Sequence, residues 1–269
     1  DLYPGSVSLA APGTGTAGVR QIRLTEVLSG KSLEDSYHTV YIVGDARVAT
    51  VDLEGRITAV APGTTRVYVV HKSHQVELTV HVAAPTVIAD PGQAIEVDAA
   101  GALLQTAGGV QVAIAAGSFD AARPVRVTDL ALDQLAVAPP SLDGIVNLAA
   151  FHVDIGASPS AFTMQLALQT AGLDPSEWEL LVMRRAPVQM PDGTTQDMWW
   201  VVDNGTIGAD GIARTASPPY PGVTSSGDYL LSARRTTNDR TGASETKFVS
   251  LDANWQLMMF QHLNMCMMV

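Results

Sequence analysis

The sequence predicts an all-β protein of two consecutive β-sandwich domains followed by a short apolar C-terminal segment. Its 269 residues provide two domains at the usual ~100 to 200 residues each. Charged residues make up 16% of the chain, whereas about 25% is typical, and Ala, Val, Thr and Gly are abundant. Several short segments also alternate apolar and polar residues between glycine- and proline-containing turns. These observations favour short strands joined by tight turns over long charged helices.

The charge balance argues against a nucleic-acid partner. A formal net charge of -11 repels phosphate backbones, and no basic cluster is longer than the pairs Arg184-Arg185 and Arg234-Arg235. We expect the acidic surface to keep an exported protein soluble, with weak calcium binding by surface aspartates left open. No other cofactor is expected.

Cysteine content and hydropathy exclude further classes. The single Cys266 allows no internal disulfide framework and no multi-cysteine metal site. No run of about 20 apolar residues is present, so we expect no membrane-spanning helix. No signal peptide follows Asp1, and we interpret the chain as a mature or excised segment of a longer exported protein.

Residues 1–85 are predicted to form the first sandwich. Apolar residues occupy every second position in 65–70 and 75–82, as in strands with one buried face. About seven short strands in this length match sandwich spacing. The expected strands are 6–9, 19–24, 39–43, 46–51, 57–60, 65–70 and 76–82.

The turns of this segment carry its most specific signal. Gly55 provides the positive φ of a hairpin bend after Asp52, and Pro62-Gly63 ends the next strand. The stretch 46–65 resembles the bacterial Ig-like domain of group 2, with its Val-Ala-x-Val-Asp pattern followed by Gly-x-x-x-Ala and Gly-x-Thr. That resemblance implies a spacer or binding module of exported bacterial proteins, without catalytic residues.

Residues 86–92 are predicted to be a proline-bearing linker, and 93–235 a second sandwich. Expected strands are 94–97, 110–114, 124–130, 151–155, 162–168, 178–183, 199–202 and 228–232. The order Gly-Gly-Val-x-Val-x-Ile-x-Ala-Gly-x-Phe, then Pro-Val-x-Val, resembles the β-sandwich shared by ankyrins, netrin receptors and zonula-occludens proteins. Ala115 replaces the family's usual proline. The His-Phe-Ser at which some members cut themselves is absent, because Phe151 precedes His152, so no self-cleavage is expected.

No enzymatic site is predicted. The chain has no Gly-x-Ser-x-Gly elbow, and its tight Ser/His/Asp grouping, Asp35-Ser36-Tyr37-His38, consists of neighbouring loop residues that rarely face one another. Glu177 and Glu179 are interpreted as solvent-facing charges beside Trp178. The histidines 71, 74 and 81 are interpreted as exposed hairpin residues and not as metal ligands.

Aromatic residues provide the candidate ligand site. Trp200 and Tyr220 could stack on sugar rings, although ordinary packing is favoured. Neighbouring strand residues point to opposite faces, so either Trp199 or Trp200 is expected in the core. The Asp-Gly and Asp-Asn-Gly sequences at 192–193, 203–205 and 210–211 are interpreted as Asx turns in preference to calcium ligands.

Residues 236–269 are predicted to be a loop and a methionine-rich docking tail. Five of the nine methionines fall in the last twelve residues, and methionine suits adaptable apolar contacts. The predicted docking residues are Trp255, Met258, Met259, Phe260 and Met265.

The sequence therefore predicts a non-catalytic structural, adhesion or assembly segment of a large secreted or cell-surface bacterial protein. Its expected partners are other proteins or further copies of the chain. Two alternatives stay open: a carbohydrate-binding accessory module of an extracellular enzyme, which would bind a glycan, and a phage virion fibre or decoration protein.

Overall fold

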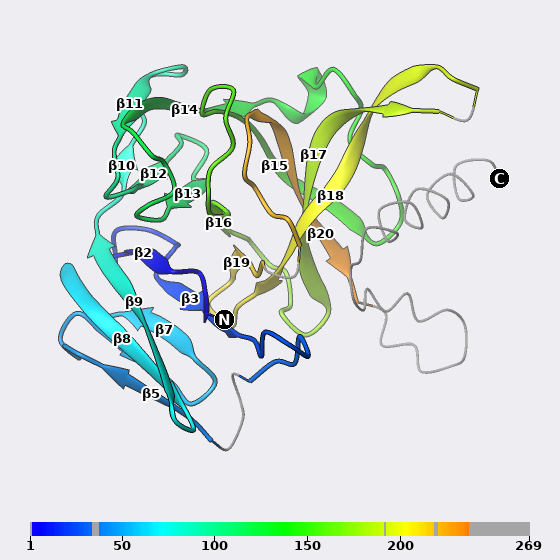
Figure 1. Cartoon of the computed structure of the whole chain (residues 1–269). Coiled ribbons are helices and arrows are strands. Elements are labelled where there is room, and N and C mark those ends of the chain that lie inside the picture. The colour runs from blue at the N-terminus through cyan, green and yellow to red at the C-terminus, as the bar shows by residue number, and fades with distance from the viewer. Residues whose placement is uncertain (1, 34–37, 191, 218–219, 237–269) are drawn as a thin grey trace, which may run out of the picture. The chain divides into compact units, whose positions relative to one another are not determined.

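The structure, a computed structural model, describes residues 2–33, 38–190, 192–217 and 220–236 (Figure 1). Within those ranges the chain is almost entirely strand, with one short 3-10 helix, η1 (Leu132–Gln134). The all-β prediction is confirmed. No helix among the described residues is long and apolar enough to cross a membrane. The predicted docking tail, with Trp255, Met258, Met259, Phe260 and Met265, lies outside the described residues.

The first sandwich spans β1 to β9. Its two main sheets have the strand orders β2-β9-β8-β5 and β3-β7-β6, and β1 pairs with β4. The β2 strand pairs in parallel with β9, whereas the other pairs are antiparallel. The strands are β1 (Leu2–Tyr3), β2 (Ser6–Ala10), β3 (Val19–Gln21), β4 (Arg23–Leu24), β5 (Thr39–Val43), β6 (Ala49–Val51), β7 (Arg56–Ala59), β8 (Gly63–His71) and β9 (His74–Ala83).

The alternation in the sequence produces the core of this sandwich. Val67 and Val69 of β8 and Leu78 and Val80 of β9 are buried in one apolar cluster with residues of β2, β6 and β7. The predicted hairpin bend is present, with Gly55 at φ +78. A Cβ added to Gly55 would lie 2.8 Å from the Tyr41 hydroxyl oxygen, so this turn requires glycine for its conformation and for its space.

The second sandwich is a single eleven-stranded sheet with the order β10-β12-β13-β16-β19-β18-β17-β20-β15-β14-β11. Its pairs are antiparallel except β10–β12. The strands are β10 (Thr86–Val87), β11 (Ala94–Val97), β12 (Ala102–Gln105), β13 (Gln111–Ile114), β14 (Arg123–Leu130), β15 (Ile145–Asp154), β16 (Gln165–Gln169), β17 (Trp178–Gln189), β18 (Thr195–Ile207), β19 (Ile212–Thr215) and β20 (Gly227–Arg235).

One core explains the curvature of this sheet. Strands from the β12 side, through Leu104, and from the β11 side, through Val97, bury residues in the same cluster as Phe151 and Tyr229. A flat sheet cannot bring its distant strands to one cluster, so the sheet curls around its core. Ile88, in the predicted linker, is buried in this core, and the two residues before it form β10. The expected linker therefore contributes to the second sandwich.

Besides β1 of the first sandwich, three short strands of the second sandwich were not predicted from the sequence. These are β10, β12 and β19, each with four residues or fewer. The β17–β18 hairpin is also longer than expected: its pairing extends from Glu179–Thr206 to Gln189–Thr195. A long hairpin can form without strict alternation of apolar and polar residues on both strands. The local periodicity therefore predicted strands that are shorter than β17 and β18.

The junction between the two sandwiches

Small apolar residues bring the two sandwiches into direct contact. Ala10 and Ala17 of the first form a buried cluster with Leu103, Ala113 and Ala167 of the second. Alanine side chains allow two sheets to approach closely, because little volume separates the backbones. Residues up to Thr236 accordingly form one compact unit containing both sandwiches.

A buried glutamine orders the polar part of this contact. Gln111 of β13 is 0% exposed, and its side-chain oxygen accepts hydrogen bonds from the amides of Thr16 (2.9 Å) and Ala17 (2.7 Å). Its side-chain nitrogen donates to the Gln105 side chain at 2.6 Å. A Cβ added to Gly15 would lie 1.8 Å from that nitrogen. The loop therefore fits over Gln111 because residue 15 has no side chain.

Three further hydrogen bonds cross the junction. The hydroxyls of Ser6 and Ser8 on β2 donate to the carbonyls of Ala116 (2.9 Å) and Ile114 (3.3 Å). The Thr163 amide donates to the Tyr3 hydroxyl oxygen at 2.9 Å. Both ends of the first sandwich's N-terminal segment are thus fixed to the second.

A buried arginine, Arg20 of β3, also crosses the junction. It is 3% exposed, and its guanidinium donates to the carbonyls of Thr215 (3.2 Å) and Ser217 (2.6 Å) in the second sandwich. Burial lowers the pKa of Arg20 to about 10, while the nearby charge of Asp203 acts in the opposite direction. The side chain therefore remains a cation at neutral pH.

Asp203 of β18 is the matching acidic group. It pairs with Val182 of β17 and so points to the core side of the sheet, where it is 0% exposed. Its Oδ1 accepts from the Ser217 hydroxyl (2.5 Å) and the Asn204 amide (2.8 Å). Its Oδ2 has no hydrogen-bond partner among the residues that the structure describes. Burial raises the pKa of Asp203 to about 7, although the Ser217 hydrogen bond and the Arg20 charge lower it.

Ser217 connects the two charged groups. Its carbonyl accepts from Arg20, and its hydroxyl lies within hydrogen-bond distance of Asp203 Oδ1 and of the Tyr220 carbonyl oxygen at 3.1 Å. The β3 strand of one sandwich is thereby linked to the core edge of the other.

The interpretation of Asp203-Asn204-Gly205 as a turn was wrong. These residues lie inside β18, which pairs with β17 on one side and β19 on the other. A Cβ on Gly205 would lie 2.0 Å from the Arg214 carbonyl oxygen, so glycine is needed for strand packing and not for a bend. The two other sequences are Asx turns as expected: Asp192 accepts from the Thr194 amide and Asp210 from the Ile212 amide.

The predicted sugar-binding aromatics do not form an open platform. Tyr220 is 6% exposed, and burial raises the pKa of its hydroxyl to about 12. It lies beside Ser217 at the junction, and a ring buried in this way offers no open face to a sugar. Trp199 and Trp200 are both half-buried, so neither is the fully buried core residue that was expected. Trp199 donates its ring N–H to the Val137 carbonyl at 3.1 Å, and sugar binding stays a prediction for Trp200.

The other titratable candidates have partners within the protein. Glu179 pairs with Arg234, and both are half-buried; Glu177 lies 3.9 Å from Arg235 and remains exposed. The ring Nδ1 of His71 hydrogen-bonds Thr39 (2.8 Å), and that of His81 hydrogen-bonds Thr64 (3.0 Å). No group of three or more His, Cys, Asp or Glu side chains suited to a metal occurs in the described part of the chain. Asp35 and Ser36 lie outside that part.

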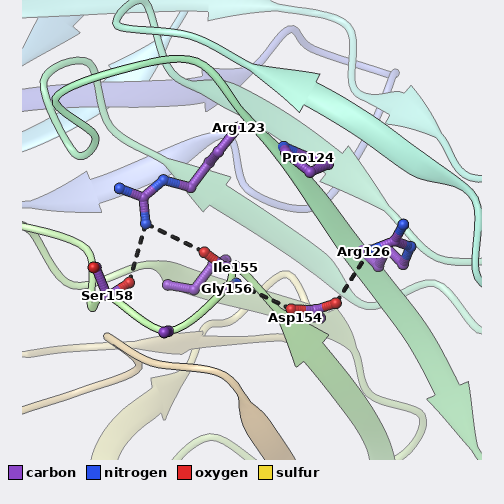
Figure 2. A pocket seen from close by; sticks show the side chains of 8 residues that line it. Arg123, Pro124, Arg126, Asp154, Ile155, Gly156 and Ser158 are labelled. Atoms are coloured by element: carbon purple, nitrogen blue, oxygen red, sulfur yellow. Dashed lines mark hydrogen bonds and ion pairs between the residues drawn. The ribbon is translucent and has the colours of Figure 1, made fainter.

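An open groove of about 400 Å³ lies where β14 and β15 separate, and Figure 2 shows the side chains that line it. Gly156, at φ +82, turns the chain away from β14. Arg123 spans the gap by donating to the carbonyls of Ile155 (3.2 Å) and Ser158 (3.0 Å), and Arg126 pairs with Asp154 at 3.1 Å. The two arginines therefore hold the loop that follows β15 in place, and their contacts are with the protein itself.

Comparisons with known proteins agree with the resemblance of the first sandwich. The family model of the bacterial Ig-like domain (group 2) matches residues 24–81. Among solved structures, domains 5-6 of the S-layer protein SbsC share 11% identity over 86% of this chain and 94% of that chain, with a TM-score of 0.26. That score is too low to support an argument about fold or function. No curated protein matches, and the resemblance of the second sandwich to the ankyrin and netrin-receptor domain stays a prediction. The similarity to the bacterial Ig-like domain of group 2 therefore covers residues 24–81, within the first sandwich.

Proposed function

We propose that residues 1–236 serve as a rigid, non-catalytic structural element of a bacterial cell-surface or secreted protein. The observation that carries this proposal is the buried junction. A chain of independent modules needs a flexible connection, with few contacts crossing the boundary. Here an apolar cluster, the Gln111 side chain and the Arg20 guanidinium all cross it. The Ig-like match supports a structural role, because the resemblance implies spacers and binding modules.

The proposal is tested by the cooperativity of unfolding in the full chain. The described tryptophans, Trp178, Trp199 and Trp200, all lie in the second sandwich. In a full chain carrying Trp255→Phe, which removes the fourth tryptophan, tryptophan fluorescence follows the second sandwich. Exchange at the Ile22 amide, which donates to the Gly55 carbonyl, follows the first. A rigid element should lose both signals at the same urea concentration. Two separate midpoints would contradict it. Labelling of intact cells with antibodies against the chain tests the location.

One observation favours glycan binding as a second candidate. Trp200 is half-buried on a strand next to Arg184, and a partly exposed indole ring can stack on a sugar. Binding on a glycan array should be lost in Trp200→Ala and kept in Trp200→Phe. The absence of any glycan binding by the wild-type chain would exclude this role.

A further inference from the structure

The junction contains a buried acid whose hydrogen bonds suit its neutral form. The Ser217 hydroxyl has one proton to donate and two acceptors within reach, Asp203 Oδ1 and the Tyr220 carbonyl oxygen. If Asp203 carries a proton on Oδ1, it donates to the Ser217 oxygen, and Ser217 donates to Tyr220. The contact between Ser217 Oγ and Asp203 Oδ1 (2.5 Å) and the contact between Ser217 Oγ and the Tyr220 carbonyl oxygen (3.1 Å) then each have a proton to share.

The ionised form satisfies fewer groups. Ser217 must then donate to Asp203, which removes its hydrogen bond to the Tyr220 carbonyl. The Asp203 Oδ2 also carries charge at a buried position, without a partner among the described residues. An unpaired polar atom in a buried site costs more when it is charged than when it is neutral.

Arg20 opposes this cost only from a distance. Among the described residues its guanidinium donates hydrogen bonds to the carbonyls of Thr215 and Ser217 and not to the Asp203 carboxylate. Because it contacts Ser217, movement of Arg20 out of the junction removes the group that holds Ser217 in place. Opening of the junction should therefore admit water to Asp203.

We propose that the junction is a proton-controlled joint, closed when Asp203 is neutral and loosened when Asp203 ionises. This inference goes beyond the proposed structural role. The two are tested separately, because the junction could serve that role and still be equally rigid at every pH. The charged and titratable groups that interact with Asp203 are Arg20 on β3 and Tyr220. Tyr3 on β1 and Arg23 on β4 act in turn on Arg20, and Glu179 and Arg234 act on Tyr220. Asp203 has the pKa of about 7 among them.

The sign of the pH effect follows from the two pKa values. The pKa of Asp203 is about 7 in the folded protein, whereas the ordinary pKa of an aspartate is 3.8, so between these values the closed state binds one more proton than an open, hydrated state. The closed state is therefore favoured at low pH and loses stability as the pH rises to about 7. Above that pH both states are ionised, and the effect levels off.

Native-state hydrogen exchange in the full chain tests the joint directly. The amides of Ala17 and Thr163 donate to acceptors across the junction, Gln111 and Tyr3. After correction for intrinsic exchange, their opening equilibrium should rise by up to about tenfold per pH unit between roughly pH 5 and 7. The amides of Ile22 and Met164, whose acceptors lie within their own sandwiches, serve as internal controls and should not follow this profile.

Two measurements keep the outcome decisive. In Asp203→Asn the profile should become flat. Asp45→Asn, at a residue whose carboxylate hydrogen-bonds Arg47 two residues later in the first sandwich, should keep it. In the wild-type chain the ¹³C resonance of the Asp203 carboxyl should titrate at the pH where exchange changes. A carboxyl that titrates there while junction exchange stays flat overturns the proposal. A pH profile that persists in Asp203→Asn overturns it as well.

Discussion

Replacing Arg20 with methionine tests how much the junction contributes to stability. The substitution keeps a long apolar side chain and removes two hydrogen bonds from a charged donor, to the carbonyls of Thr215 and Ser217. Hydrogen bonds of this kind contribute about 1.5 to 3 kcal/mol each. Relief of the desolvation of a guanidinium that is 3% exposed offsets part of that loss. We expect a net destabilisation of about 3 kcal/mol, the size seen when one member of a buried charged group is removed.

Urea denaturation at pH 7.5, followed by tryptophan fluorescence and circular dichroism, measures this change. Arg47→Met is the matched control, because the Arg47 side chain is 90% exposed and forms its ion pair with Asp45 two residues away; no measurable change is expected there. A loss below about 1 kcal/mol in Arg20→Met would refute the argument that the buried guanidinium stabilises the junction.

The double variant Arg20→Met/Asp203→Asn separates charge from hydrogen bonding. With Arg20 removed, Asp203 loses the positive charge that lowers its pKa, so its ionised form becomes more costly at pH 7.5. Removing the acid as well should recover part of the lost stability. Simple addition of the two single effects would show that the charges are not coupled.

Two other substitutions test the local geometry. Gly205→Ala should destabilise the chain by more than about 2 kcal/mol, because the alanine Cβ would lie 2.0 Å from the Arg214 carbonyl oxygen. If the variant unfolded at the same temperature as the wild-type chain, β18 and β19 would not approach as closely as described. Gln111→Ala should cost about 2 kcal/mol by leaving the buried Ala17 amide without its 2.7 Å acceptor. Faster exchange at Ala17 with unchanged exchange at Ile22 would locate that loss at the junction.

The fold of the first sandwich could be predicted because its signals are local. Alternation in β8 and β9 specifies which face is buried, and Gly55 specifies a bend through its own backbone angle. The second sandwich is less predictable, because a short strand such as β19 depends on pairing with β16, which is distant in the chain.

The junction could not be predicted for the same reason. Arg20 lies in a predicted strand at a position where an arginine normally faces solvent, and its acceptors are almost two hundred residues away. Asp203 precedes Asn-Gly, the residues preferred in tight turns. Its burial results from the partner strands on both sides. One local signal was available: Val201, Asp203, Gly205 and Ile207 occupy every second position of β18, so Asp203 shares its strand face with two apolar residues.

The parallel pairing of β2 with β9 has a mechanical consequence. Along the chain, β2 is the first and β9 the last strand of the first sandwich's four-stranded sheet, and within the sheet they are neighbours. Their pairing is in register from Ser6–Thr79 to Ala10–Ala83. Tension applied between the start of β2 and the end of β9 pulls along the strands, so their hydrogen bonds are loaded in shear and must break together. The Ser6 and Ser8 hydroxyls also tie β2 to the second sandwich, so that part of a pulling force on the N-terminal strand passes directly into the neighbouring sheet.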